Sequence, residues 1–240
     1  MVAVSFEKYL GLLDDGLGSS AVSHYRKPAR CHLSALCDRY GSDKGSLTES
    51  GHPYPWPAHN YVDYYASLFG HCRQYIRRVF ECGLGTNQPG LPSTMGRAGR
   101  PGASLRVWRD YFPSAQVFGV DIDRSILFSE ERIQTAWVDQ TDVTSVSSLW
   151  QSNALDDFDL MVDDGLHTYE AGVTLFEGSV HRLADEGVYI IEDVSLASLL
   201  KFKRYFEGTD YRVEYVRLLC PQRPPTSDNS LVVIRNPDRY

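Results

Sequence analysis

The sequence predicts an α/β protein whose mostly parallel sheet is covered by helices on both faces. After about residue 76, short apolar runs alternate with longer amphipathic segments, as in repeated strand–helix units. The last two apolar runs are joined by a loop too short for a helix, which indicates an antiparallel hairpin. Before residue 76 the apolar residues recur at helical spacing. We therefore expect a helical cap, a parallel core and a closing hairpin.

The first 75 residues contain three helical patterns and one long loop. The loop covers 41–60 and is rich in glycine, proline and serine. We expect 1–75 to form a helical cap and a lid over substrate and cofactor, and 76–240 to form the binding core. The helical patterns cover 6–13, 31–40 and 60–70.

Five β-branched or aromatic runs after residue 76 predict the parallel strands. Amphipathic segments at 103–112 and 169–183 predict helices between them. Because strands and helices alternate, both faces of the sheet should be covered. The predicted parallel strands are 78–82, 116–120, 135–138, 158–162 and 188–191, and the hairpin strands are 211–219 and 229–236.

Composition narrows the class of partner. The net charge of −7 argues against nucleic acid, because phosphate binding needs a concentrated basic face. There is no signal-peptide pattern and no apolar run of ~20 residues, so we expect no membrane partner. The five cysteines form no CxxC pair, which favours reduced thiols. We expect a cytoplasmic protein with a small-molecule partner.

The residues at the ends of the first three predicted core strands are typical of a nucleoside-binding site. Gly83 and Gly85 follow the first core strand, Asp121 ends the second and Asp139 follows the third. Ligands of open parallel sheets bind at the carboxyl ends of the strands, where Asp121 could accept hydrogen bonds from ribose. A tight turn is the alternative reading of the glycines, and a helix N-cap that of Asp139. Together these residues favour an adenosine ligand.

A glycine-rich insertion separates the first strand from its helix. A dinucleotide site needs three glycines opening directly into the helix. Here residues 86–102 delay that helix, which favours a ligand without phosphates, such as S-adenosylmethionine. The insertion is either a lid, with Arg97 and Arg100 meeting an anionic group, or a surface loop.

Three carboxylates follow the next two strands. Asp164 follows the fourth strand, and Glu192 and Asp193 follow the fifth. Neighbouring strand ends lie ~5 Å apart, so these carboxylates would repel one another unless a cation or protons neutralised them. Oxygen ligands suit Mg²⁺, which could orient a hydroxyl and lower its pKa.

His167 lies three residues after Asp164 and is a candidate general base, because its unperturbed pKa lies near neutrality. A capping or solvent-facing histidine is the alternative. Asp163 could cap the next helix or support the ligands from behind. His59 is a candidate for the mouth of the cofactor or substrate site.

Several motifs resemble those of class I S-adenosylmethionine-dependent methyltransferases. They are RYGSDKG (39–45), HNYVDYY (59–65), FECGLGT (80–86), and DDGLHTY (163–169) with IEDV (191–194). More narrowly, the chain is similar to the metal-dependent sugar O-methyltransferases of macrolide and antibiotic biosynthesis. The resemblance implies a Rossmann-like sheet with S-adenosyl-L-methionine and Mg²⁺ as cofactors.

The resemblance also implies residue roles. His167 would be the general base, assisted by Asp164. The metal ligands would be Asp164, Glu192 and Asp193, and the cofactor would contact Lys44, Tyr61, Glu81, Gly83, Gly85, Asp121, Asp139 and Gln140. Enzymes of this type can carry a further N-terminal domain, whereas this chain has about 75 residues before the core. The acceptor and any homo-oligomeric assembly therefore stay open.

The predicted function is Mg²⁺-dependent O-methylation of a hydroxyl, on a sugar of a secondary metabolite. One alternative is N-methylation of an amine or guanidine in a natural product, which has less need of a metal. A metal-dependent hydrolase or a nucleotide-binding protein is an alternative of another class. Binding of S-adenosylhomocysteine would separate either transferase from the last alternative.

Overall fold

The computed structural model describes residues 21–25, 31–46, 54, 56–219 and 228–237. The helix expected over 6–13 lies outside these residues. Within them no helix is long and apolar enough to cross a membrane.

The described strands form one sheet in the order β1-β8-β9-β7-β6-β2-β3-β5-β4. Its five central strands, β7, β6, β2, β3 and β5, pair in parallel. β8 and β9 pair antiparallel, which confirms the predicted hairpin. The strands are β1 (Ala21–Tyr25), β2 (Arg78–Cys82), β3 (Gln116–Asp121), β4 (Ser129–Glu130), β5 (Ile133–Trp137), β6 (Phe158–Asp163), β7 (Leu183–Ile191), β8 (Arg212–Leu219) and β9 (Ser230–Arg235).

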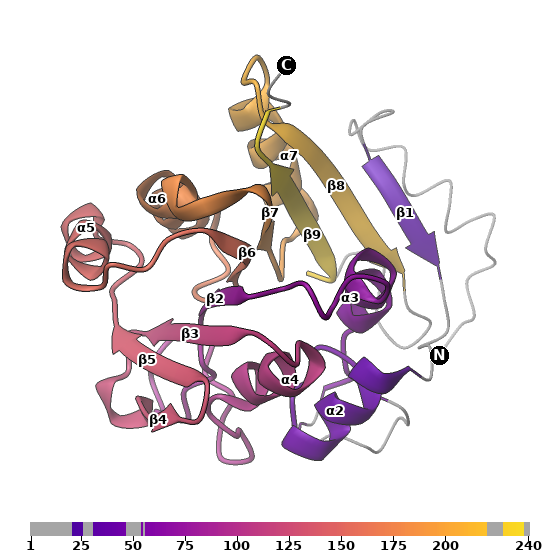
Figure 1. The fold of residues 1–240 in the computed structure, drawn as a ribbon. Coiled ribbons are helices and arrows are strands. Elements are labelled where there is room, and N and C mark those ends of the chain that lie inside the picture. The colour runs from indigo at the N-terminus through magenta and orange to yellow at the C-terminus, as the bar shows by residue number, and fades with distance from the viewer. Residues whose placement is uncertain (1–20, 26–30, 47–53, 55, 220–227, 238–240) are drawn as a thin grey trace.

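Helices cover both faces of the sheet (Figure 1). α2 (His32–Tyr40), α3 (Tyr61–Phe69) and α4 (Ala103–Tyr111) share one apolar cluster with the sheet. α5 (Val143–Ser152), α6 (Tyr169–Ser179) and α7 (Leu196–Phe206) share a second cluster on the opposite face. The two clusters take alternate residues of β2, with Val79 in one and Phe80 in the other, as the pleat of a strand requires. The predicted doubly covered sheet is confirmed.

The N-terminal segment is not purely helical, which corrects one expectation. β1 lies at the edge of the sheet and pairs in parallel with β8, Ala21 opposite Tyr215. The five residues of β1 are too few to show a clear alternation of apolar and polar residues. We attribute the extended conformation of this segment to its pairing with β8. The two helices predicted at 31–40 and 60–70 are present as α2 and α3.

The direction of the chain through the sheet changes at β2. From β2 the chain passes to β3 and β5 on one side, then returns to β6 and β7 on the other. Ligands of such sheets bind beyond the carboxyl ends of the strands at this point. A cavity lies at the carboxyl ends of β2, β3, β5 and β6.

Candidate active site

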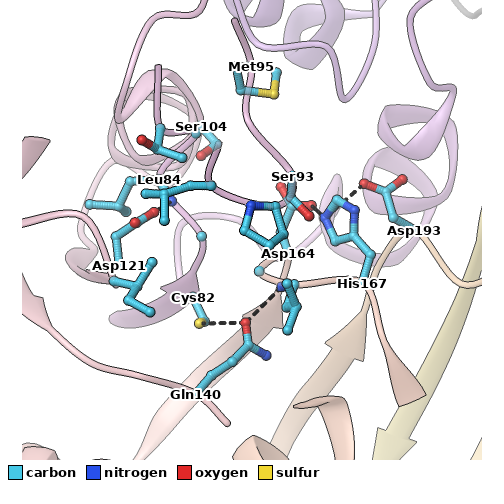
Figure 2. A pocket seen from close by; sticks show the side chains of 18 of the residues that line it. Cys82, Leu84, Ser93, Met95, Ser104, Asp121, Gln140, Asp164, His167 and Asp193 are labelled. Carbon is cyan, nitrogen blue, oxygen red and sulfur yellow. Dashed lines mark hydrogen bonds and ion pairs between the residues drawn. The ribbon is translucent and has the colours of Figure 1, made fainter. Parts of the chain in front are cut away.

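A cavity of about 290 Å³ lies at the change of direction in the sheet (Figure 2). Most of the predicted site residues line it: Lys44, Gly83, Gly85, Asp121, Asp139, Gln140, Asp164, His167 and Asp193. Three predicted residues do not line it: Tyr61, Glu81 and Glu192. Each of these three instead contacts a residue of the wall.

The turn after β2 needs its glycines. Gly83 has φ +96° and Gly85 has φ +82°, conformations that other residues rarely adopt. A Cβ on Gly83 would lie 2.0 Å from the carbonyl oxygen of Asp164. The missing side chain thus lets the β2 turn approach the β6 turn across the floor of the cavity.

Replacing Gly83 with alanine should therefore separate these two turns. We expect a loss of stability of about 1–3 kcal/mol, since strain at positive φ adds to a clash with backbone that cannot rotate away. Thermal unfolding measures it. Gly90→Ala is the matched control, because Gly90 also has positive φ but meets no atom within 4 Å. Equal melting temperatures for the two variants would contradict the close approach.

Asp121 is held at the end of β3 by backbone amides. Leu84 N–H donates to one carboxylate oxygen at 2.7 Å, and Asp123 N–H donates to the other at 2.8 Å. Burial raises the pKa of Asp121. The carboxylate lines the cavity in a fixed orientation, which suits an acceptor for ribose hydroxyls.

The helix-cap reading of Asp139 is wrong. Asp142 is the N-cap of α5, its side chain accepting a hydrogen bond from Thr144 N–H at 2.9 Å. Asp139 accepts instead from Thr141 within the loop and lines the cavity. The neighbouring Gln140 accepts from Leu166 N–H at 2.8 Å, which joins the β5 loop to the β6 turn.

Lys44 lies among three carboxylates: Glu81 in β2, Asp164 directly after β6 and Glu192 directly after β7. Its Nζ is 2.6 Å from Asp164 Oδ2 and 3.2 Å from Glu81 Oε1, and it also pairs with Glu192. Burial opposes its charge, but these carboxylates outweigh burial and raise the pKa of Lys44 well above its usual range. The lysine therefore stays charged and neutralises part of the acidic cluster.

The remaining metal-binding chemistry is in Asp164, His167 and Asp193. One ligand atom from each lies within 4.8 Å of those of the other two. The His167 Nε2 is 3.3 Å from Asp164 Oδ1 and 3.3 Å from Asp193 Oδ2, so the imidazole lies between the carboxylates (Figure 2). Glu192 is not in this group, because Lys44 and the Tyr65 hydroxyl occupy its oxygens.

The charge state of His167 depends on the two carboxylates. Burial lowers the pKa of His167, but Asp193 and Asp164 outweigh burial and raise it to about 10. The imidazole therefore holds a proton at neutral pH while both carboxylates are uncompensated. His167 has φ +61° and Asp193 has φ +51°, so both lie on sharp turns that leave their strands.

Two residues of the N-terminal segment contact the Asp193 carboxylate and fix its orientation. The Tyr61 hydroxyl donates to Asp193 Oδ1 at 2.5 Å, and His59 Nε2 lies 3.3 Å from the same oxygen. The other nitrogen of His59 lies 2.9 Å from Asn229 Oδ1, before β9. His59 is buried there and does not line the mouth of the cavity, contrary to expectation.

Asp163 supports the β5 and β6 loops. It accepts hydrogen bonds from Gln140 Nε2 at 3.1 Å and Gly165 N–H at 3.3 Å. Burial raises its pKa to about 6. Thr168, not Asp163, caps α6. The capping reading of Asp163 is therefore wrong, and its support of the metal ligands stays a prediction.

Sequence reasoning missed two partners of the buried carboxylates. The Tyr65 hydroxyl donates to Glu192 Oε1 at 2.6 Å, and Trp108 Nε1 donates to Glu81 Oε2 at 2.7 Å. Both residues lie in amphipathic helical segments of the sequence, Tyr65 in 60–70 and Trp108 in 103–112. A buried tyrosine or tryptophan usually finds a partner for its polar atom, and that is the signal that could have identified them.

Known proteins resemble this chain in sequence and in fold. No family model matches the chain. It is 32% identical over 188 residues to the 8-demethyl-8-alpha-L-rhamnosyl tetracenomycin-C 2'-O-methyltransferase of Streptomyces olivaceus, covering 78% of this chain and 44% of that protein. It is 28% identical over 187 residues to the mycinamicin VI 2''-O-methyltransferase of Micromonospora griseorubida, covering 76% and 44%. The chain thus spans less than half the length of these curated relatives.

Solved structures share the fold. The MycE methyltransferase of mycinamycin biosynthesis, in complex with Mg, SAH and mycinamycin VI, superposes with a TM-score of 0.60 at 23% identity, over 88% of this chain and 55% of that one. A caffeoyl-CoA O-methyltransferase-like structure from Staphylococcus aureus gives 0.54 at 9% identity, over 86% and 93%.

The fold is therefore the Rossmann-like fold of class I S-adenosylmethionine-dependent methyltransferases. More narrowly, the chain is a homologue of the sugar O-methyltransferases of macrolide and antibiotic biosynthesis.

Proposed function

We propose that this protein is a Mg²⁺-dependent O-methyltransferase that uses S-adenosyl-L-methionine to methylate a sugar hydroxyl of a secondary metabolite. The observation that carries the proposal is the position of Asp164, His167 and Asp193 in the same cavity as Asp121. One wall suits the adenosine part of the methyl donor, and the adjoining wall carries a base and carboxylates for the acceptor. The relatives named above support the sugar as acceptor class.

The donor set fits a divalent metal ion. Asp164 and Asp193 offer carboxylate oxygens within 4.8 Å of each other, and oxygen ligands suit Mg²⁺. Asp164 is exposed enough to be reached from the cavity, with 22% of its side chain accessible. Glu192, the third predicted ligand, would have to exchange Lys44 for the ion. Bound there, Mg²⁺ would supply positive charge that orients the acceptor oxygen and lowers its pKa.

His167 is the proposed proton acceptor. A cation at Asp164 and Asp193 would offset the carboxylates that hold the proton on this imidazole. His167 would then take the hydroxyl proton while the acceptor oxygen attacks the methyl carbon. The oxygen–carbon bond forms, and the sulfur–methyl bond breaks with its electron pair going to sulfur. Products are the methyl ether, S-adenosylhomocysteine and a proton on His167.

The surrounding residues position these groups. Tyr61 and His59 hold Asp193, and Gly83 lets the β2 turn approach Asp164. Asp121 fixes the ribose end of the donor. Holding both substrates in line supplies much of the acceleration in a two-substrate transfer.

Metal removal tests the proposal directly. We expect the purified chain to bind S-adenosylhomocysteine in titration calorimetry. It should transfer a methyl group to a rhamnosylated polyketide with Mg²⁺, and EDTA should abolish turnover while cofactor binding persists. Asp193→Asn should lower turnover at least a hundredfold at saturating Mg²⁺. Full activity in EDTA would refute the metal, and failure to bind S-adenosylhomocysteine would refute the methyltransferase.

A further inference from the structure

The glycine-rich segment 86–102 forms a wall of the cavity. Met95 N–H donates to the Thr86 carbonyl at 2.8 Å, and Asn87 Nδ2 donates to the Gly99 carbonyl at 3.0 Å. Gly102 N–H donates to the Leu84 carbonyl at 2.7 Å. The residues of this segment that line the cavity are Thr86, Leu91, Pro92, Ser93, Met95 and Arg100.

The side chain of Arg100 lines the cavity and packs against Gly41. A Cβ on Gly41 would lie 2.7 Å from Arg100 Cδ and 3.1 Å from its Nε. Gly41 is the C-cap of α2 and has φ +80°, a conformation that favours glycine, and the arginine side chain packs closely against it. The arginine backbone is fixed as well, because its carbonyl accepts from Ala103 N–H at 3.0 Å at the start of α4.

Among the residues that the structure describes, Arg100 is a cation of the cavity wall that pairs with no carboxylate. Lys44 pairs with three carboxylates, and His167 lies between two. Arg100 has no ion pair with any of the residues that the structure describes. An arginine facing a cavity without an anionic partner is suited to bind a carboxylate of a ligand through two parallel hydrogen bonds.

Tyr54 lies near Arg100 in the wall of the cavity. The Tyr54 hydroxyl donates to the Gly41 carbonyl at 2.8 Å, beside the arginine. Burial raises the pKa of Tyr54 to about 12; Asp43 and Asp164 raise it too, while the charge of Arg100 lowers it. Arg100 and Tyr54 thus lie beside the same glycine, and both line the cavity.

The order of the strands determines which part of the methyl donor lies there. Asp121 at β3 and Asp139 after β5 suit the adenosine, and the reacting methyl group must face His167 after β6. The donor therefore extends across the end of β2, which lies between β3 and β6. Its amino-acid end then lies over the β2 turn, where the Gly102 N–H bond to the Leu84 carbonyl holds the end of the segment that carries Arg100.

We propose that Arg100 binds the α-carboxylate of the methionine part of S-adenosylmethionine and so selects donors that carry the amino-acid end. This inference rests on the proposed function. Under this proposal the glycine-rich segment 86–102 contributes to the choice of methyl donor.

Two ligands separate this role from a general effect on the cavity. S-adenosylhomocysteine carries the α-carboxylate, and 5'-methylthioadenosine lacks the whole amino-acid end. In titration calorimetry, Arg100→Met should weaken S-adenosylhomocysteine binding about tenfold to a hundredfold, as expected for loss of a charge-assisted hydrogen bond. Binding of 5'-methylthioadenosine should change less than about twofold. Arg100→Lys should restore part of the lost affinity, since the charge is kept but the paired geometry is not.

Arg97→Met is the matched control, because Arg97 is an exposed arginine of the same segment that does not line the cavity. It should leave both affinities unchanged. Unchanged S-adenosylhomocysteine affinity in Arg100→Met would overturn the inference, as would an equal loss for both ligands. A wild-type chain that binds 5'-methylthioadenosine but gains nothing from the amino-acid end would also overturn it. If wild type binds neither ligand, the proposed function itself fails.

Discussion

Replacing His167 with alanine should lower kcat by about 10²–10⁴-fold, because a positioned general base contributes that much to proton transfer. Affinity for S-adenosylhomocysteine should stay within about threefold of wild type, since the imidazole contacts Asp164 and Asp193 rather than the residues proposed to hold adenosine. Steady-state kinetics with Mg²⁺ and titration calorimetry measure the two effects separately.

His181 provides the control for His167→Ala. It lies in a short 3-10 helix, Val180–Arg182, and does not line the cavity. His181→Ala should leave kcat unchanged. Turnover by His167→Ala within tenfold of wild type would exclude His167 as the base and leave proton removal to another group.

Replacing Lys44 with methionine should cost about 3–5 kcal/mol of folding stability, the usual effect of removing one partner from a buried ion pair. Only 3% of the lysine side chain is exposed, and Glu81 and Glu192 are fully buried beside it. In a chain of this length such a loss lowers the melting temperature by roughly 10 °C. Thermal unfolding in EDTA measures it, so that no added cation replaces the lost charge.

Lys201 offers a matched lysine on the surface. It pairs with Glu170 at 3.0 Å, but 52% of its side chain is exposed. Lys201→Met should change stability by less than about 1 kcal/mol, as exposed ion pairs contribute little. If Lys44→Met unfolds within 2 °C of Lys201→Met, the lysine is not what neutralises the buried carboxylates.

Much of the fold could be predicted from local pattern. The strand predicted at 78–82 matches β2, and the fourth strand runs one residue further than predicted, to Asp163. These strands have apolar residues on both faces, so burial in a covered sheet is visible in the sequence itself. β7 begins earlier than predicted, at Leu183, because the exposed Asp185 and Glu186 interrupt its apolar pattern.

The site was only partly predictable. That Asp164 and Asp193 come together follows from neighbouring parallel strands, and β6 and β7 are indeed neighbours. Local pattern says nothing about a residue that joins the site from 120 or 148 positions away, as Lys44 does. The sequence places Glu192 beside the other carboxylates and so predicts it as a metal ligand. In the structure, Lys44 and Tyr65 contact its carboxylate oxygens.

The pairing of Lys44 with Glu192 also has a consequence for the order of folding. The two residues are 148 positions apart, and one sits before the central strands whereas the other follows β7. Contacts so distant along the chain form slowly, because a long loop must close before they contribute. Until β7 joins the sheet, Glu192 cannot reach Lys44, so the cluster of Lys44, Glu81 and Glu192 cannot be complete. We therefore expect protection of this charged cluster from hydrogen exchange to appear late, together with completion of the sheet.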